Sequence, residues 1–240
     1  MSYRSLATDY DGTLATDGQV AAKTLTALEQ WRSAGRQLIL ITGRQLDDLQ
    51  TVFARFDLFD WIVAENGAVL YQPATRTELL LAEPPPAAFV QALDDRIRQA
   101  ERVKNPLSKE FDRLRNLAPV ATGRVIVATW TPHDQTAIEL IQAMGLSLQV
   151  ILNKGAVMIL PHGIDKAVGL QAAIAQLNGS LDQVVGVGDA ENDLAFLTLC
   201  GYSVAVNNAL PLVKDQVDWV TQGDRGAGVE QLIKYLLQQE

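Results

Sequence analysis

Apolar and polar positions repeat in a regular order along the first part of the chain. Compact apolar runs of strand length alternate with segments in which apolar side chains recur near helical spacing, as Leu25, Leu28 and Trp31 do before Gly35. Strands that alternate with helices indicate β-α units and a largely parallel sheet. The pattern predicts strands beginning near Leu6 and at 37–42 and 61–64, with helices at 20–35 and 46–56.

The rhythm changes after three consecutive prolines at 84–86, which can continue neither a helix nor a strand. The next segments are predicted as helix, strand, helix and hairpin at 87–103, 124–130, 134–144 and 148–160. The first rhythm then resumes, with helices at 166–177, 194–199 and 229–237 and strands at 184–187 and 202–206. The predicted fold is α/β: a Rossmann-like, mainly parallel sheet core of residues 1–83 and 161–240, with an inserted α+β domain at 84–160.

The composition limits the classes of partner. The chain has 240 residues, of which 48% are hydrophobic, enough to bury a sizeable core. Its formal net charge is −8, whereas nucleic acids and anionic membranes attract basic surfaces. We therefore expect neither as a partner, and an anionic substrate would need local cations.

The single cysteine, Cys200, lies in an apolar run, and we expect it to be a buried small hydrophobe. One cysteine also excludes an intrachain disulfide and a cysteine-based metal site. The first residues do not resemble a signal peptide, and glycine, asparagine and proline interrupt the uncharged stretch at 195–213. A cytoplasmic protein is the expectation.

Two aspartates follow the first predicted strand. Asp9 and Asp11 stand two positions apart, so in an extended chain both project to one side, about 6–7 Å apart. Gly12 then turns the chain. In open α/β folds the carboxyl ends of the strands form the edge where ligands bind. The alternative is an ordinary Asp-Gly turn with two solvated carboxylates.

Two later positions offer groups that suit a phosphate. Thr42 and Gly43 follow the second core strand, where a hydroxyl and free amides can hold a phosphate oxygen. The alternative for Thr42 is a helix cap. Lys166 opens a predicted helix, where the helix dipole disfavours a cation. This position suggests a role in binding phosphate, and the alternative is an exposed, solvated lysine.

A second acidic group follows the strand at 184–187. Asp189 and Asp193 are four residues apart in the run Gly188-Asp-Ala-Glu-Asn-Asp193, so they can converge on one side of a helical turn. Carboxylates without a basic neighbour suit a hard divalent cation such as Mg²⁺. The alternative is helix capping by Asp189 or Asn192.

These positions all fall at strand ends or helix starts of the predicted core, which suggests one site. A carboxylate that attacks a phosphate dianion is repelled by about 4 kcal/mol for each pair of unit charges at 4 Å and an effective dielectric constant near 20. A shared cation and an ammonium group would offset this repulsion. Phosphoryl transfer depends mostly on positioning and charge neutralisation, and the set offers both.

The four motifs D-Y-D-G-T, I-T-G-R, the helix-opening lysine and G-D-A-E-N-D, in this order, resemble those of the haloacid dehalogenase superfamily. The chain is most similar to its Cof-like phosphatases, which carry an α+β cap between the third strand and the lysine motif, and the resemblance covers essentially the whole chain. It implies that Asp9 is a nucleophile that forms an aspartyl-phosphate, and that Asp11 is the general acid and base. Ala167 departs from the Lys-Gly that many relatives have, which we expect to be tolerated.

The resemblance further implies a Mg²⁺-dependent phosphatase. Thr42, with Gly43, and Lys166 would hold the phosphoryl group, and Asn192 would touch phosphate or order the waters of the metal. The implied metal ligands are Asp9, the Asp11 backbone carbonyl, Asp189 and, directly or through water, Asp193.

Other functions stay open at the level of the sequence. A phosphomutase would use the same chemistry. A silent phospho-ligand-binding protein would usually have lost Asp9 or Asp11, and a receiver domain would be about half as long. The substrate is expected to be a small phosphorylated metabolite, such as a sugar phosphate, phosphoglycolate or a sugar-phosphate disaccharide. Candidate contacts from the inserted domain are Arg124, Lys154 and His162. The sequence does not indicate the oligomeric state.

Overall fold

The computed structural model describes residues 3–104, 119–153 and 155–239. The chain divides into two compact units, which are described separately: Met1–Leu81 together with Ile164–Glu240, and Ala82–Gly163. Most of the segment 105–121, which shows no clear pattern in the sequence, lies outside the described residues.

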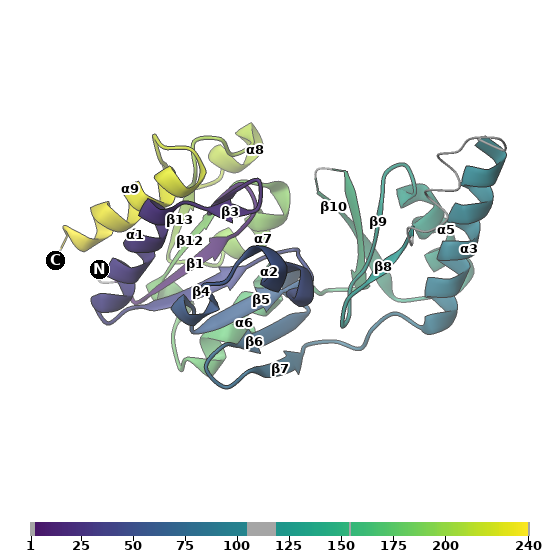
Figure 1. Cartoon of the computed structure of the whole chain (residues 1–240), viewed down its shortest axis with the longest axis horizontal. Helices are drawn as coiled ribbons and strands as arrows, with labels where there is room; N and C mark the ends of the chain where they lie inside the picture. The colour runs from purple at the N-terminus through teal and green to yellow at the C-terminus, as the bar shows by residue number, and fades with distance from the viewer. Residues whose placement is uncertain (1–2, 105–118, 154, 240) are drawn as a thin grey trace. The chain divides into compact units, whose positions relative to one another are not determined.

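The first unit is built on one sheet with the strand order β14-β13-β12-β1-β4-β5-β6-β7 (Figure 1). Neighbouring strands from β14 to β5 pair in parallel, and β6 and β7 extend the sheet as antiparallel strands. This sheet confirms the prediction of a mainly parallel α/β core. The strands are β1 Ser5–Asp9, β4 Gln37–Ile41, β5 Trp61–Ala64, β6 Val69–Gln72, β7 Thr77–Leu80, β12 Val184–Gly188, β13 Tyr202–Ala205 and β14 Trp219–Val220.

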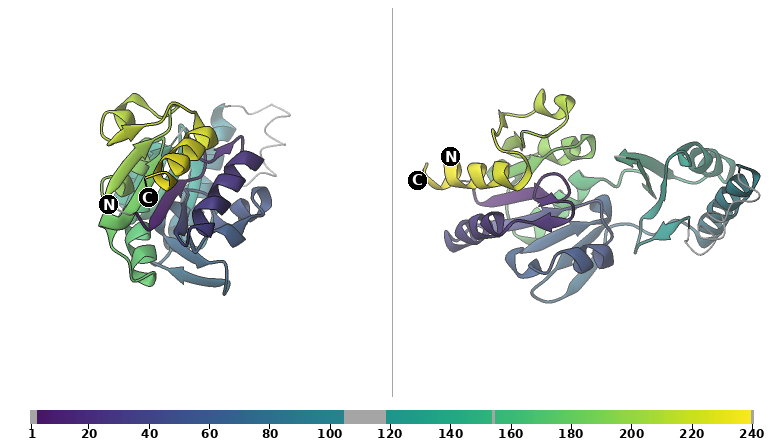
Figure 2. Two further views of the ribbon diagram at one scale, coloured as in Figure 1. Left: turned by 90° about the vertical axis from the view of Figure 1, so that its left-hand side faces the viewer. Right: turned by 45° about the horizontal axis from the view of Figure 1, so that its top comes forward.

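Helices cover both faces of this sheet. In Figure 2, α1 and α9 run side by side over one face, and they are in direct contact. On the other face α6 packs on β4 and β5, and α7 on β12. The helices are α1 Ala22–Ser33, α2 Leu46–Val52, α6 Lys166–Gln176, α7 Leu194–Leu197, α8 Pro211–Lys214 and α9 Arg225–Leu237; a small hairpin pairs β2 Ala15–Thr16 with β3 Gln19–Val20.

The burial of the central strands explains why the sequence shows compact apolar runs. Every residue of β1, β5 and β12 is buried, because helices cover both faces of the parallel sheet. The structure adds β6, β7, β14 and α8, which the sequence pattern does not predict. These are short, and β7 lies at the sheet edge with mostly exposed side chains, so it has no apolar run to reveal it.

Two helix boundaries differ from the prediction by more than two residues. The predicted helix 46–56 is wrong beyond Val52, because Phe53 takes an extended conformation and its side chain is buried. The last helix begins at Arg225 rather than at 229. Two glycines, Gly226 and Gly228, obscure its start in the sequence, but a Cβ atom at Gly226 would overlap the side chain of Thr24, so close packing requires glycine there.

The second unit has its own core. Its antiparallel sheet has the order β10-β11-β9-β8, and Phe89, Leu93 and Ile97 of one helix pack with Leu140 of another and with Ile159 of the sheet. This arrangement confirms the predicted α+β character. The elements are α3 Ala87–Lys104, β8 Ala121–Thr122, β9 Val127–Trp130, α5 Asp134–Ala143, β10 Leu148–Asn153 and β11 Ala156–Pro161.

Candidate active site

Adjacent parallel strands bring the predicted residues to one edge of the first unit. The order β12-β1-β4-β5 places four carboxyl ends next to one another. Asp9 ends β1, Thr42 follows β4 and Asp189 follows β12. Lys166 begins α6, whose N-terminus is capped by the Asp165 carboxylate, which accepts hydrogen bonds from the backbone amides of Ala167 and Val168.

A buried lysine joins two of the motifs. Lys166 Nζ donates to Asp9 Oδ1 and to Asp193 Oδ1, both at 2.6 Å. The lysine side chain is 2% exposed, and the two carboxylates are 6% and 0% exposed. The alternative of an exposed, solvated Lys166 is therefore wrong, as is that of a solvated Asp9.

Burial sets the electrostatics of this cluster. The pKa of Asp9 is raised to about 8, chiefly because burial removes the carboxylate from water; the charges of Asp193 and Asp189 also raise it, and the nearby Lys166 ammonium opposes the rise. For Lys166, burial lowers the pKa, but the two carboxylates outweigh burial and leave the pKa above its usual value. The lysine is therefore held in its charged form.

Three carboxylates fit a divalent cation. Asp9, Asp189 and Asp193 are buried, and one oxygen of each lies within 4.8 Å of the others. Thr13 Oγ1 donates to Asp189 Oδ1 at 3.2 Å, which fixes that side chain. A compact set of hard oxygen donors suits Mg²⁺. Buried carboxylates that repel one another would also gain from a shared cation.

Asp193 has a structural task as well. Its Oδ2 accepts from the backbone amides of Asp189 and Ala190, at 2.8 and 2.9 Å, while Oδ1 faces Lys166. Capping of this turn is therefore done by Asp193, and not by Asp189 or Asn192 as the alternative supposed. Its fixed carboxylate links the lysine to the Asp189 loop.

Asp11 has a different partner from Asp9. Its two carboxylate oxygens accept from Arg44 Nε at 2.6 Å and Nη2 at 2.9 Å, the bidentate geometry of a strong ion pair. Arg44 also donates to Asp48 at 2.6 Å, and its guanidinium lies over the Tyr10 ring. Asp11 is therefore a half-buried, oriented carboxylate rather than a free one.

Thr42 lies in the loop that carries Arg44. The residue is 1% exposed, and its Oγ1 accepts from the Arg44 amide at 3.1 Å. Gly43 lies between them and is half-buried. Thr42 is not the cap of α2, whose capping position is Gln45. A hydroxyl that accepts one hydrogen bond still has a proton to donate.

The sequence matches the family model of haloacid dehalogenase-like hydrolases over residues 6–107 and 134–233. The chain belongs to this family. It is 27% identical over 241 residues to a phosphoglycolate phosphatase of Pyrobaculum aerophilum, and the alignment covers 99% of this chain and 97% of the relative.

Among solved structures, the chain is similar to a haloacid dehalogenase-like hydrolase from Bacteroides thetaiotaomicron, with a TM-score of 0.75 and 19% identity, and 98% and 100% of the two chains are covered. A haloacid dehalogenase (HAD) subclass IIB sugar phosphatase has a TM-score of 0.69 at 18% identity, with 97% and 98% covered. At these identities the structural matches show the fold alone.

The three candidate substrate contacts belong to the inserted segment and not to the cluster around Asp9. Arg124 and His162 lie in the second unit, in a turn before β9 and just after β11, and the His162 side chain is exposed. Lys154 lies outside the described residues. Contacts of all three with a substrate stay predictions.

A turn to which the sequence pattern assigns no role joins the motifs. Residues Glu65–Gly67 follow β5, and the amides of Glu65 and Asn66 donate to the carbonyls of Arg44 and Thr42, at 2.9 and 3.0 Å. The Asn66 side chain accepts from Asn192 Nδ2 at 3.1 Å. The turn lies at the carboxyl end of a core strand, as Asp9 and Thr42 do, and this position is the sequence signal that could have indicated its role.

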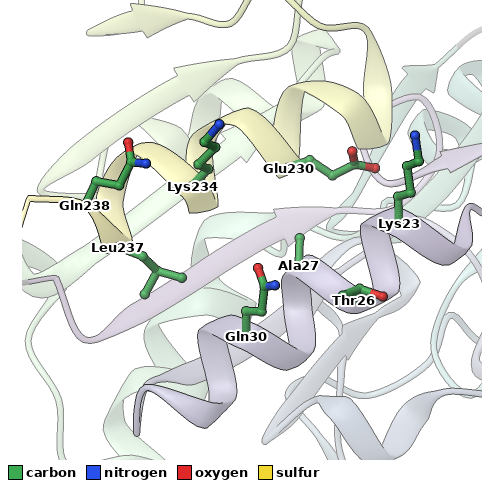
Figure 3. Close-up of a pocket in the computed structure, with 8 residues that line it drawn as sticks. All are labelled: Lys23, Thr26, Ala27, Gln30, Glu230, Lys234, Leu237 and Gln238. Carbon is green, nitrogen blue, oxygen red and sulfur yellow. The ribbon is translucent and has the colours of Figure 1, made fainter.

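A separate hollow of about 410 Å³ lies between α1 and α9, with Lys23 and Ala27 on one helix and Glu230 and Lys234 on the other (Figure 3). It contains none of the residues predicted for the site. Among the described residues, no helix is both long and apolar enough to cross a membrane.

Proposed function

We propose that this hydrolase is a Mg²⁺-dependent phosphatase that cleaves small phosphomonoesters through an aspartyl-phosphate on Asp9. The observation that carries the proposal is the buried cluster in which Lys166 Nζ lies 2.6 Å from both Asp9 and Asp193. A carboxylate nucleophile beside a fixed ammonium group is what attack on a dianion requires. The family membership and the phosphatase relatives support the same class of enzyme.

In the first step, Asp9 forms a bond to phosphorus while the bond to the ester oxygen breaks. Asp11 in its protonated form gives its proton to the leaving alcohol, and the carboxylate that results is the form that Arg44 binds through two hydrogen bonds. Lys166 and the hydroxyl of Thr42 bind the phosphoryl oxygens, and the loop amides beside Gly43 complete the cradle. Burial of Asp9 excludes bulk water from the first step, so the carboxylate competes with few other nucleophiles.

In the second step, Asp11 takes a proton from water, and the resulting hydroxide displaces Asp9 from phosphorus. Inorganic phosphate leaves and Asp9 is regenerated. Arg44 orients Asp11 through two hydrogen bonds, which keeps this carboxylate close to the loop that follows β1.

A Mg²⁺ ion would be held by Asp9, Asp189 and the backbone carbonyl of Asp11, with Asp193 bound directly or through water. When bound, it would offset the repulsion between the carboxylates and the phosphate dianion. Asn192 would contact the substrate close to the phosphoryl group. A relative named phosphoglycolate phosphatase and a structural neighbour named sugar phosphatase support a small phosphorylated metabolite as the substrate class.

The test is release of inorganic phosphate from a panel of phosphomonoesters, with Mg²⁺ and with EDTA. Asp9→Asn preserves shape but removes the nucleophile, and we expect its activity to fall by more than about a thousandfold. The matched control is Asp182→Asn, an exposed aspartate that precedes β12 at the other end of that strand, which should keep full activity. Full Mg²⁺-dependent turnover by Asp9→Asn would overturn the mechanism. An inert wild type across the panel would overturn the function.

A further inference from the structure

The turn Glu65–Gly67 is held among the loops of the site by its backbone. Besides the two bonds to the loop after β4, Gly67 packs so closely on the start of α6 that a Cβ atom there would overlap the carbonyl oxygen of Asp165. The turn therefore lies between the loop after β4 and the helix that carries Lys166. Its side chains are fixed relative to both.

The backbone of this turn is unusual. Glu65 and Asn66 have φ values of 52° and 54°, in the left-handed region that non-glycine residues rarely adopt. Asparagine tolerates this conformation better than most residues, whereas glutamate does not. Conformations of this kind persist where the surroundings impose them, and they are frequent at functional sites. The left-handed backbone of Asn66 therefore suggests a functional role for its side chain.

Asn66 is 1% exposed and pairs with Asn192 through one hydrogen bond, from Asn192 Nδ2 to Asn66 Oδ1. Asn66 Nδ2 and Asn192 Oδ1 are both buried, and neither has a hydrogen-bond partner among the described residues. If both amides were turned around, the pair would again make one bond and again leave one donor and one acceptor. The unmatched donor and acceptor are therefore independent of how the amides are assigned.

Buried polar groups without partners are rare in proteins and call for an explanation. A neighbouring donor and acceptor match a group that both accepts and donates, which is the property of a hydroxyl. A fully ionised phosphoryl oxygen would accept from Nδ2 but would be repelled by Oδ1. The charged phosphoryl group also has its own partner in Lys166, whereas the amide pair is neutral.

We propose that the Asn66–Asn192 pair binds a carbon-borne hydroxyl of the substrate next to the phosphoester, and so selects hydroxylated phosphomonoesters, such as sugar or polyol phosphates, over phosphoglycolate. This inference rests on the proposed function, because it places the pair beside the phosphoryl group. Asn192 adjoins Asp193, which bonds to Lys166, and the Asn66 amide bonds to the carbonyl of Thr42.

The experiment compares two substrates that differ by one hydroxyl: 2-hydroxyethyl phosphate and ethyl phosphate. For the wild type with Mg²⁺ we expect kcat/KM to favour the hydroxylated ester by about tenfold or more, since a site built for a hydroxyl discriminates against an analogue that lacks it. In Asn66→Gly, which keeps the left-handed backbone without strain, the ratio should fall to near one. Phosphoglycolate should be a poorer substrate than 2-hydroxyethyl phosphate for the wild type.

Asn178→Gly is the matched control, because Asn178 has a φ of 51° and lies at the end of α6. It should leave the substrate ratio unchanged. Asn192→Ala should reduce the ratio as Asn66→Gly does, and the double variant should reduce it no further, because both residues would act on one hydroxyl.

The outcomes separate the two claims. If the wild type hydrolyses both esters with equal kcat/KM, the proposed phosphatase stands and the hydroxyl site is refuted. If Asn66→Gly lowers kcat/KM equally for both esters, the amide pair acts on the phosphoryl group or on the fold, and the hydroxyl site is again refuted. If the wild type hydrolyses neither ester nor any other monoester, the proposed function fails and this inference fails with it.

Discussion

At the scale of single residues, the first unit places three carboxylates and one ammonium group out of contact with water. Buried charges are costly unless they are paired and hydrogen-bonded. Lys166 meets this condition through two short bonds, and Asp193 through bonds to Lys166 and to two backbone amides. The pairing lets the site keep charged groups in a low-dielectric environment, where electrostatic interactions with a phosphoryl group are strongest.

Cys200 illustrates the opposite case, a titratable group kept neutral. Burial raises the pKa of its thiol from 9.0 to about 12, so the thiol stays protonated at neutral pH. We expect iodoacetamide to label the native protein at least about a hundredfold more slowly than the urea-unfolded chain near pH 8, because the thiolate is the reactive form. Mass spectrometry of timed samples measures this. Cys200 is half-buried rather than fully buried as expected, and equal labelling rates for native and unfolded protein would contradict this shielding of its thiol.

At the scale of elements, two glycines let the first turns of α6 approach the neighbouring backbone closely, in addition to the apolar packing of buried residues such as Leu170. Gly67 presses on the carbonyl of Asp165, and Gly169 faces Val63 and Gly67 with no room for a side chain. This close approach brings the start of α6, and with it Lys166, to the carboxyl edge of the sheet. The position of the lysine therefore depends on two glycines that carry no chemistry.

We predict that Gly67→Ala disrupts this docking. Its φ is 108°, and the added Cβ would overlap the Asp165 backbone, so we expect a loss of unfolding free energy of about 3 kcal/mol or more and a fall in kcat. Urea denaturation and phosphate release measure the two effects.

Gly35→Ala is the control for this prediction. Gly35 also has a positive φ, 75°, but no atom lies within 4 Å of a Cβ built there. The unfolding free energy of this variant should fall only by the cost of a left-handed alanine, about 1 kcal/mol, and its activity should be unchanged. Similar losses in the two variants would mean that contact with Asp165 is not the cause.

At the scale of the whole molecule, the acidic cluster couples stability to pH and to metal. The pKa of Asp9 rises from 3.8 to about 8 in the folded state. A carboxyl whose pKa is raised on folding contributes stability that is fully present below its unfolded pKa and is lost as pH rises through its folded pKa. Without divalent cations, the raised pKa of Asp9 should therefore make the free energy of unfolding fall as the pH rises from about 4 to about 8.

Mg²⁺ competes with the proton for these oxygens, so its stabilising effect should grow with pH. We predict a larger increase in Tm from saturating Mg²⁺ near pH 8 than near pH 5, measured by differential scanning fluorimetry. Asp9→Asn should show a weaker dependence on both pH and Mg²⁺. A Mg²⁺ effect that is absent, or that is the same at both pH values, would contradict the cation site.

Much of the core was predictable because its signals are local. Buried parallel strands give continuous apolar runs, and β5 and the hairpin of β10 and β11 lie where the pattern predicts them. Short edge elements such as β7 and β14 bury too little to leave a pattern. The start of α9 was missed because glycines weaken its helical signal, and one of them, Gly226, is required by close packing on Thr24 of α1, far away in sequence.

The sequence by itself determined the chemical groups of this protein and the edge of the sheet where they gather, since strand ends follow from local periodicity and right-handed crossovers place them on one edge. Only the tertiary structure decided which groups touch: that Lys166 bridges Asp9 and Asp193, that Asp11 pairs with Arg44, and that an unmatched amide pair joins Asn66 to Asn192. The reason is physical. These contacts span 27 to 157 positions of the chain, and the packing of side chains between loops, unlike the period of a helix or strand, leaves no regular pattern in the sequence.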